Sequence, residues 1–151
     1  MALPNRKALR LPSYDYSQAN YYFVTICTDR RRPLFGLPEA PTALGSLAEQ
    51  ELRNIAGHFS NVRVDEYVLM QDHIHVIFVF SHCAERSRPF PTLSSVVGLY
   101  KSGVSRKARS GNIWQKSFYD RVLRNEKEYL EVWRYIDENP AAIAIEPAIF
   151  G

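Results

Sequence analysis

The stretch MQDHIHVIFVF, residues 70–80, decides the fold of this chain, because it predicts a strand whose two faces differ. Side chains alternate between the two faces of a strand. One face therefore carries His73 and His75, and the other carries Ile74, Val76, Phe78 and Phe80. We expect the apolar face to pack beneath helices and the histidines to lie on the face that is not the core.

Strand signals also lie upstream of this stretch. Residues 64–70 predict a second strand, and only Gln71 and Asp72 separate it from the first. A tight antiparallel hairpin is the simplest connection, although the pair lacks the glycine that a two-residue turn prefers. The aromatic and β-branched residues 21–28 predict a further strand.

Apolar residues at helical spacing predict two helices between and after these strands. The first covers residues 44–57, where Ser46 and Glu49 have the spacing of a capping box. The second covers residues 93–109, and Gly111 follows it as a stop signal.

The remaining sequence predicts one more strand and one more helix. Residues 113–119 have strand composition, and Asn125 with Glu128 caps a helix that runs to Asn139, before Pro140. The order β-α-β-β-α-β plus a terminal helix is that of an α+β, ferredoxin-like split βαβ fold. We expect an antiparallel sheet with helices on one face and the other face open. This fold serves RNA-binding modules, metal carriers and nucleases, so it assigns no function.

Length and composition fit one folded domain. The chain has 151 residues, of which 46% are hydrophobic, and this excludes a disordered or low-complexity protein. We expect a single domain over residues 1–151 with a basic N-terminal arm at residues 1–11. Positive charge is concentrated, since residues 86–119 hold seven basic side chains and no acidic one. An anionic partner is therefore plausible.

The cysteines and the apolar runs bear on the compartment. Cys27 and Cys83 are far apart in sequence and form no paired motif, which favours a reducing cytoplasm. The longest apolar run, residues 76–80, is far shorter than the ~20 residues that cross a bilayer. We expect no membrane partner and no export signal.

Two histidines two residues apart on a strand could hold a metal ion. Their backbones are ~7 Å apart on one face, so the imidazoles of His73 and His75 can converge on a single cation. Ordinary polar alternation on a half-exposed strand accounts for the pair equally well. His58 and His82 have no such partner in the sequence.

The last helix carries a second candidate group. Its apolar stripe predicts a docked face, and Tyr135 lies about a quarter-turn to one side of that stripe. Asn139 is one turn further on the same edge. A tyrosine at a core boundary and a simple helix stop explain these residues as well, and by residue type Tyr119 or Tyr129 could take the same role. The stripe consists of Tyr129, Val132, Trp133 and Ile136.

Basic residues interleaved with aromatic ones form the third feature. Such a combination suits phosphate neutralisation and base stacking on single-stranded nucleic acid, although solvated helix faces also carry charge runs. The basic candidates are Arg30, Arg31, Arg32, Lys101, Arg106, Lys107, Arg109 and Lys116.

In order along the chain, five motifs resemble the single-tyrosine HUH transposases of bacterial insertion sequences, and among them the REP-associated tyrosine transposases most. The motifs are residues 21–25, residues 32–36, His73-Ile74-His75, Trp114-Gln115 and residues 135–140. Two departures are Gln71, where relatives often have proline, and Asn139, where many have glutamine.

The resemblance implies an enzyme that cleaves and rejoins DNA strands through a 5′-phosphotyrosine, in transposition or repeat processing. It implies Tyr135 as nucleophile, and His73, His75 and Asn139 as ligands of a divalent ion, Mg²⁺ or Mn²⁺. Single-stranded or hairpin DNA is the expected substrate, held by the eight basic candidates. A cytoplasmic bacterial protein that joins the nucleoid when DNA-bound is implied, and monomer and homodimer both stay open.

Two other functions stay open. One is a catalytically silent single-stranded nucleic-acid-binding module on the same fold, which the basic and aromatic residues would serve equally. The other is a structural metal-binding protein.

Overall fold

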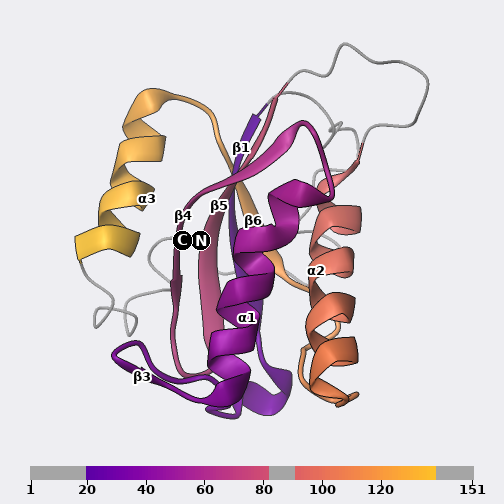
Figure 1. The fold of residues 1–151 in the computed structure, drawn as a ribbon. Helices are drawn as coiled ribbons and strands as arrows, with labels where there is room; N and C mark the ends of the chain where they lie inside the picture. Colours follow the sequence, from indigo (N-terminus) through magenta and orange to yellow (C-terminus); the bar gives the residue numbers. More distant parts are fainter. Residues whose placement is uncertain (1–19, 82–90, 139–151) are drawn as a thin grey trace.

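The computed structural model describes residues 20–81 and 91–138, and these form a four-stranded antiparallel sheet with helices on both sides (Figure 1). The strand order is β4-β5-β1-β6. These strands are β1 (Asn20–Cys27), β4 (Val62–Leu69), β5 (His73–Phe80) and β6 (Tyr119–Leu123). This is the ferredoxin-like order predicted from the sequence. The arm at residues 1–11, Cys83, Asn139 and Pro140 lie outside the described residues.

The register of the sheet aligns the residues of interest across three strands. Thr25 on β1 pairs with His75 on β5, and Cys27 pairs with His73. On its other side Thr25 pairs with Tyr119 at the start of β6. These side chains therefore belong to one face, because directly opposed residues of an antiparallel pair project on the same side.

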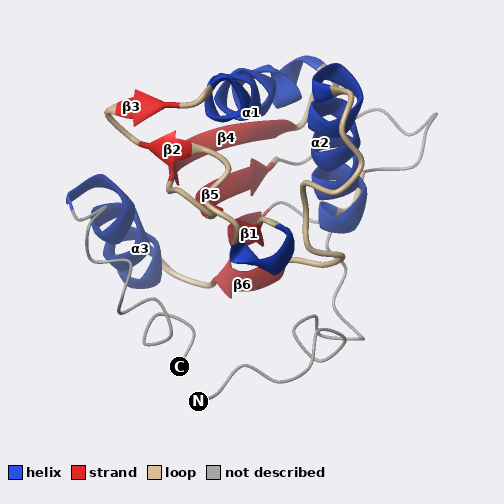
Figure 2. Cartoon of the chain, turned by 90° about the horizontal axis from the view of Figure 1, so that it is seen from below, coloured by secondary structure: helices blue, strands red, loops and turns tan. Residues whose placement is uncertain are grey.

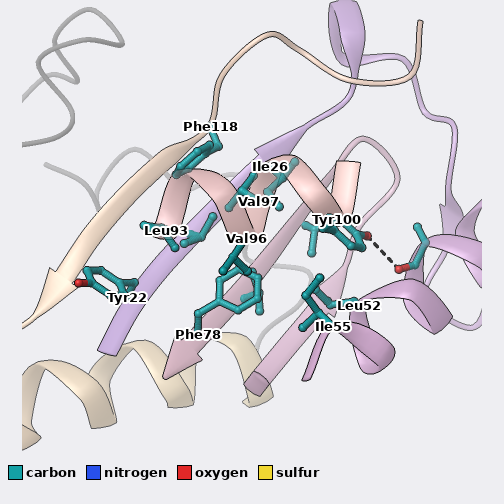
Figure 3. Close-up of a cluster of buried hydrophobic side chains, with 14 of the residues drawn as sticks. Tyr22, Ile26, Leu52, Ile55, Phe78, Leu93, Val96, Val97, Tyr100 and Phe118 are labelled. Carbon is teal, nitrogen blue, oxygen red and sulfur yellow. Dashed lines mark hydrogen bonds between the residues drawn. The ribbon is translucent and has the colours of Figure 1, made fainter. Parts of the chain in front are cut away.

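Helices α1 (Ala43–Asn54) and α2 (Leu93–Ala108) cover one face of the sheet (Figure 2). The short helix η3 (Ile55–Gly57) continues α1. The main core forms between these helices and the sheet (Figure 3), and Tyr100 donates its buried hydroxyl to the carbonyl of Ala48 at 2.9 Å. Strand β5 contributes to this core the four apolar side chains that the alternation predicts, Ile74, Val76, Phe78 and Phe80.

Helix α3 (Glu126–Glu138) packs on the opposite face (Figure 2), so the expectation of an open face is wrong in part. Val132 and Ile136 are buried there against Phe23 and Ile77 of the sheet. The physical reason is that this face is itself apolar over half its length, and the stripe of α3 gains stability by covering it.

Two sequence predictions are wrong at element boundaries. The N-cap of α1 is Thr42, four residues before the expected Ser46, and its hydroxyl accepts the Gly45 N–H at 3.0 Å. Residues 113–118 form a loop rather than a strand, and the apolar side chains of Ile113 and Phe118 in this loop are buried in the main core. An isolated bridge joins Trp114 to Thr28, directly after β1, and the Gln115 N–H donates to the carbonyl of Cys27 at the end of β1.

Short elements between β1 and α1 were not predicted. They are η2 (Asp29–Arg31) and the small hairpin of β2 (Gly36–Leu37) and β3 (Ala40–Pro41). Within residues 20–81 and 91–138, no helix has the length and apolar character needed to span a membrane.

Candidate active site

His73 and His75 lie side by side on the α3 face of the central strand β5. Each imidazole is 1% exposed. Their ring centroids are 4.8 Å apart and the rings are nearly perpendicular, at 74°. The alternation predicted from the sequence is therefore present, but the pair is buried rather than half-exposed.

An acidic and a basic side chain surround His73. Its Nδ1 lies 2.6 Å from Oδ1 of Asp72, and Oδ2 of Asp72 accepts from Nε of Arg31 at 3.2 Å. Burial alone would raise the pKa of the Asp72 carboxyl, but the hydrogen bonds from His73 and Arg31 outweigh it. The pKa therefore lies below its usual range, and Asp72 is a carboxylate at neutral pH.

The second imidazole has a neutral neighbour instead. Nδ1 of His75 is 2.9 Å from the buried hydroxyl of Thr25. Burial, with smaller effects from His73 and Arg31, lowers the pKa of His75 well below its ordinary value. His75 is thus a neutral ring, and among the described residues its Nε2 is buried with no hydrogen-bond partner. A neutral imidazole with an unsatisfied nitrogen fits the requirements of a metal ligand.

Tyr135 on α3 contacts one ring of this pair, that of His75. Its ring is half-buried and meets the ring of His75 edge-on, with centroids 5.7 Å apart and an angle of 69°. The helical spacing that predicts Tyr135 at the margin of the docked face is therefore correct. Val132 and Ile136 fill the centre of that face.

The two rival tyrosines have different positions. Tyr129 packs against Tyr21, whose strand partner Val79 is four residues, or ~13 Å, along β5 from His75. Burial, reinforced by the hydrogen bond that its hydroxyl donates to Asp65, raises the pKa of Tyr129 to about 12. Tyr119 instead lies on the histidine face, two strands from His75 through Thr25. Tyr129 therefore lies too far from His75 to share a site with it. Of the two alternatives to Tyr135 as nucleophile, Tyr119 is the nearer to the histidines.

Further ligands for a metal ion must come from other residue types or other segments. Within the described part of the chain, no group of three or more His, Cys, Asp and Glu side chains could hold a metal. The third ligand expected from the sequence, Asn139, lies outside the described residues. The histidine pair is the part of the expected ligand set that the structure describes.

Half of the basic candidates contact the protein itself. Arg31 pairs with Asp72, and Arg32 bonds the Asn112 carbonyl and lies 3.7 Å from the Asp29 carboxylate. Lys101 donates to the carbonyls of Gln115 and Ser117 at 2.8 and 2.9 Å, and Lys107 pairs with Glu51 at 2.6 Å. These four side chains hold loops and helices together. The other four, Arg30, Arg106, Arg109 and Lys116, are exposed.

Two residues at the site escape sequence reasoning. Asp72 directly precedes the histidine strand and has the sequence position of a turn residue, although a carboxylate beside a candidate ligand is a recognisable signal. Thr25 has the sequence character of a strand former. Its contact with His75 depends on the pairing register of β1 and β5, which the sequence does not show.

A cavity of about 320 Å³ lies elsewhere, on the outer side of β4 beside the β2–β3 hairpin and α1. Glu49, Glu66 and Tyr67 are among its lining residues, and Glu49 accepts the hydroxyl of Tyr67 at 2.8 Å. None of the residues predicted for the site lines this cavity.

Comparisons with known proteins identify a relative of the chain and structures that share its fold. No protein-family model matches it. An uncharacterized protein of Haemophilus influenzae is 31% identical over 159 residues, covering 90% of this chain and 88% of that protein.

Two solved structures share the fold. The structure of a REP-associated tyrosine transposase bound to a REP hairpin has a TM-score of 0.65 and 20% identity, covering 94% of this chain and 74% of that one. A candidate transposase of Deinococcus radiodurans R1 has a TM-score of 0.53 and 16% identity, covering 85% of this chain and 95% of that one. The chain therefore belongs to the family of the Haemophilus influenzae protein, and its fold is that of the REP-associated tyrosine transposases.

Proposed function

We propose that this protein is a transposase-like enzyme that cleaves and rejoins single-stranded or hairpin DNA, with Tyr135 as its nucleophile and a divalent ion at His73 and His75. The observation that carries the proposal is the edge-on contact of Tyr135 with His75 beside a second imidazole. A structural tyrosine has no need of two buried histidines, whereas a nucleophile needs a charge-stabilising centre within reach.

The chemistry of the metal follows from the donor set. His73 and His75 would hold the ion together with Asn139. Imidazoles are softer than the oxygen ligands that Mg²⁺ prefers, so Mn²⁺ suits the pair as well. When bound, the ion polarises the scissile phosphate and offsets the negative charge that develops on it.

The reaction assigns a role to Tyr135 at each step. The phenol gives its proton to water, and its oxygen attacks the scissile phosphorus to form a tyrosyl phosphoester. The bond from phosphorus to the 3′ oxygen breaks, and that oxygen takes a proton to become a 3′-hydroxyl. The 5′-phosphotyrosine conserves the energy of the bond, so attack by another 3′-hydroxyl rejoins a strand and releases Tyr135.

DNA is the proposed substrate because the neighbouring structure of this fold is a complex with a REP hairpin. Charge supports the same substrate, since Arg106, Arg109 and Lys116 follow one another at the end of α2 and in the next loop, and Arg30 lies in η2. That loop is joined to the segment after β1 by the hydrogen bond from the Asp29 N–H to the Ile113 carbonyl, at 2.8 Å. Exposed cations of this kind neutralise phosphates and bring affinity without base specificity.

An adduct assay tests the proposal. The full chain is incubated with end-labelled hairpin DNA and Mn²⁺ or Mg²⁺, denatured and separated by electrophoresis. We expect a covalent protein–DNA species in the wild type that Tyr135→Phe abolishes. Tyr119→Phe is the matched control, because Tyr119 has the same chemistry on the same face, and Tyr129→Phe controls for the distant end of that face.

The outcomes separate the candidate functions. An adduct that survives in Tyr135→Phe and disappears in Tyr119→Phe refutes the assignment of the nucleophile. Hairpin binding with no adduct across a library of sequences favours the non-catalytic binding module. His73→Ala and His75→Ala should remove the adduct and leave affinity for the hairpin largely intact, because affinity depends mainly on phosphate contacts.

A further inference from the structure

Asp72 is held in place before it contacts His73. Its carbonyl accepts the backbone N–H and the hydroxyl of Thr28, at 3.0 and 3.1 Å. The carbonyl of the preceding residue, Gln71, accepts the N–H of Phe35 at 3.0 Å. The turn between β4 and β5 is therefore fixed by the segment that follows β1, and the side chain of Asp72 starts from a constrained backbone.

Arg31 fixes the side chain as well. Its Nε donates to Oδ2 of Asp72 at 3.2 Å, which leaves Oδ1 directed at His73. Arg30 and Arg31 have φ values of 57° and 54°, in the left-handed region that residues other than glycine seldom occupy. Such conformations persist where the surroundings enforce them and are concentrated at functional sites.

The distances indicate which nitrogen of the neutral His73 ring carries the proton. A carboxylate only accepts hydrogen bonds and a guanidinium only donates them. Oδ1 of Asp72 is 2.6 Å from Nδ1, a separation that would be repulsive if Nδ1 held a lone pair. Nη2 of Arg31 is at the longer distance of 3.4 Å from the same atom. The neutral ring therefore has its proton on Nδ1 and its lone pair on Nε2.

His75 has no such constraint. The hydroxyl of Thr25 can donate to Nδ1 or accept from it, so this contact is compatible with either tautomer. The two histidines are thus oriented by different means, and one of the two contacts specifies the tautomer that a metal ligand needs.

We propose that Asp72, braced by Arg31, is a positioning residue that keeps the proton of His73 on Nδ1 and so presents Nε2 to a divalent cation. The proposal rests on the proposed function for the cation, while the position of the proton stands on the geometry of the chain. Arg31, expected from the sequence to contact DNA, takes a second role as the brace of Asp72.

Two measurements on the full chain test the proposal. Two-bond ¹H–¹⁵N correlation spectra of ¹⁵N-histidine protein, recorded without metal, report the tautomer of each ring. Titration with Mn²⁺, followed by the paramagnetic resonance signal of the free ion, reports affinity. In the wild type we expect His73 with its proton on Nδ1 and measurable Mn²⁺ binding.

Four variants give the expected pattern. Asp72→Ala should move the His73 proton partly or wholly to Nε2 and weaken Mn²⁺ binding by about 10- to 100-fold, the usual cost of removing such a partner. Asp72→Asn should rescue both readouts, because the amide oxygen still accepts from Nδ1. Arg31→Met should give a tautomer population and an Mn²⁺ affinity between those of Asp72→Ala and Asp72→Asn. Asp29→Ala is the matched control, since this neighbouring carboxylate pairs with Arg32 and not with His73.

Each outcome is decisive. A wild-type His73 protonated on Nε2, or an Asp72→Ala variant with unchanged tautomer and Mn²⁺ affinity, overturns the proposal, and a DNA adduct in the wild type would still support the proposed function. If the wild type has the Nδ1 tautomer but binds no Mn²⁺, the metal part of the proposed function fails, and with it the presentation of Nε2 to a cation.

Discussion

At the scale of single residues, the buried hydroxyl of Thr25 offsets the free-energy cost of burying the imidazole of His75. Thr25 is fully buried, and its oxygen is the partner of Nδ1. A buried nitrogen that loses its partner costs about 1–3 kcal/mol, whereas replacing both partners by apolar groups is close to neutral. The contribution of this contact is therefore measurable as a coupling between the two residues.

We predict that Thr25→Val lowers the free energy of unfolding by about 1–3 kcal/mol, because valine keeps the shape of threonine but leaves Nδ1 of His75 without a partner. In a His75→Phe background the same substitution should be neutral or stabilising. Urea unfolding of the four proteins in this double-mutant cycle provides the measurement. Equal losses in both backgrounds would contradict the contact.

Tyr129 provides a second residue-level prediction, in alkaline solution. The pKa of its hydroxyl is raised from 10.0 to about 12 in the folded chain. Between these pH values the unfolded state releases the proton and the folded state keeps it, so the stability that the hydroxyl contributes is complete below pH 10 and is lost as pH rises towards 12. Comparing the unfolding of wild type and Tyr129→Phe across this range should show their difference shrinking. A constant difference would exclude the shift.

At the scale of elements, α1 and α2 differ in how closely other backbone approaches them. A Cβ built on Gly45, in the first turn of α1, would lie 2.2 Å from the carbonyl oxygen of Phe35. Around a Cβ built on Gly98, in α2, no atom of the described residues lies within 4 Å. Packing therefore requires a glycine at position 45 but not at position 98.

We predict opposite effects for alanine at these two positions. Gly45→Ala should destabilise the protein by about 1–3 kcal/mol or more, because backbone atoms must move apart. Gly98→Ala should stabilise it by about 0.5–1 kcal/mol, because alanine loses less conformational entropy in a helix. Thermal unfolding of both variants, compared with the wild type, measures the two effects. A Gly45→Ala protein as stable as the wild type would show that the β1–α1 connection can shift.

At the scale of the whole molecule, the distribution of basic side chains determines how binding responds to salt. Arg106, Arg109 and Lys116 are exposed, whereas Lys107 in the same region pairs with the buried side chain of Glu51. An exposed cation that neutralises a phosphate releases a counterion on binding, and an ion-paired one releases none from the DNA.

We predict that alanine at Arg106, Arg109 or Lys116 lowers the slope of log affinity against log salt by about 0.7 for each phosphate of single-stranded DNA that the variant leaves unneutralised. Lys107→Ala should leave the slope unchanged and reduce stability, since Glu51 stays buried without its partner. Fluorescence anisotropy of labelled DNA at a series of KCl concentrations measures the slope. If all four variants keep the slope of the wild type, these side chains do not contact DNA phosphates.

The sequence by itself determined the order of the elements, the two faces of β5 and the docked stripe of α3. These properties depend on periodicity within one segment, and periodicity is written in the local order of apolar and polar residues. The same local information places Tyr135 at the edge of its helix and His73 beside His75 on one face. The strand predicted at residues 113–119 shows the limit of this approach, because loop residues buried in a core have the composition of a strand.

Only the tertiary structure decided what surrounds these residues. The register of β1 against β5 brings Thr25 to His75, and the loop after β1 brings Arg31 to Asp72. The packing of α3 on the second face brings Tyr135 against His75, and it brings Tyr129 against Tyr21 instead. Such contacts join residues about 40 to 60 positions apart in the chain, and the physical reason they escape sequence reading is that each depends on the packing of several elements at once.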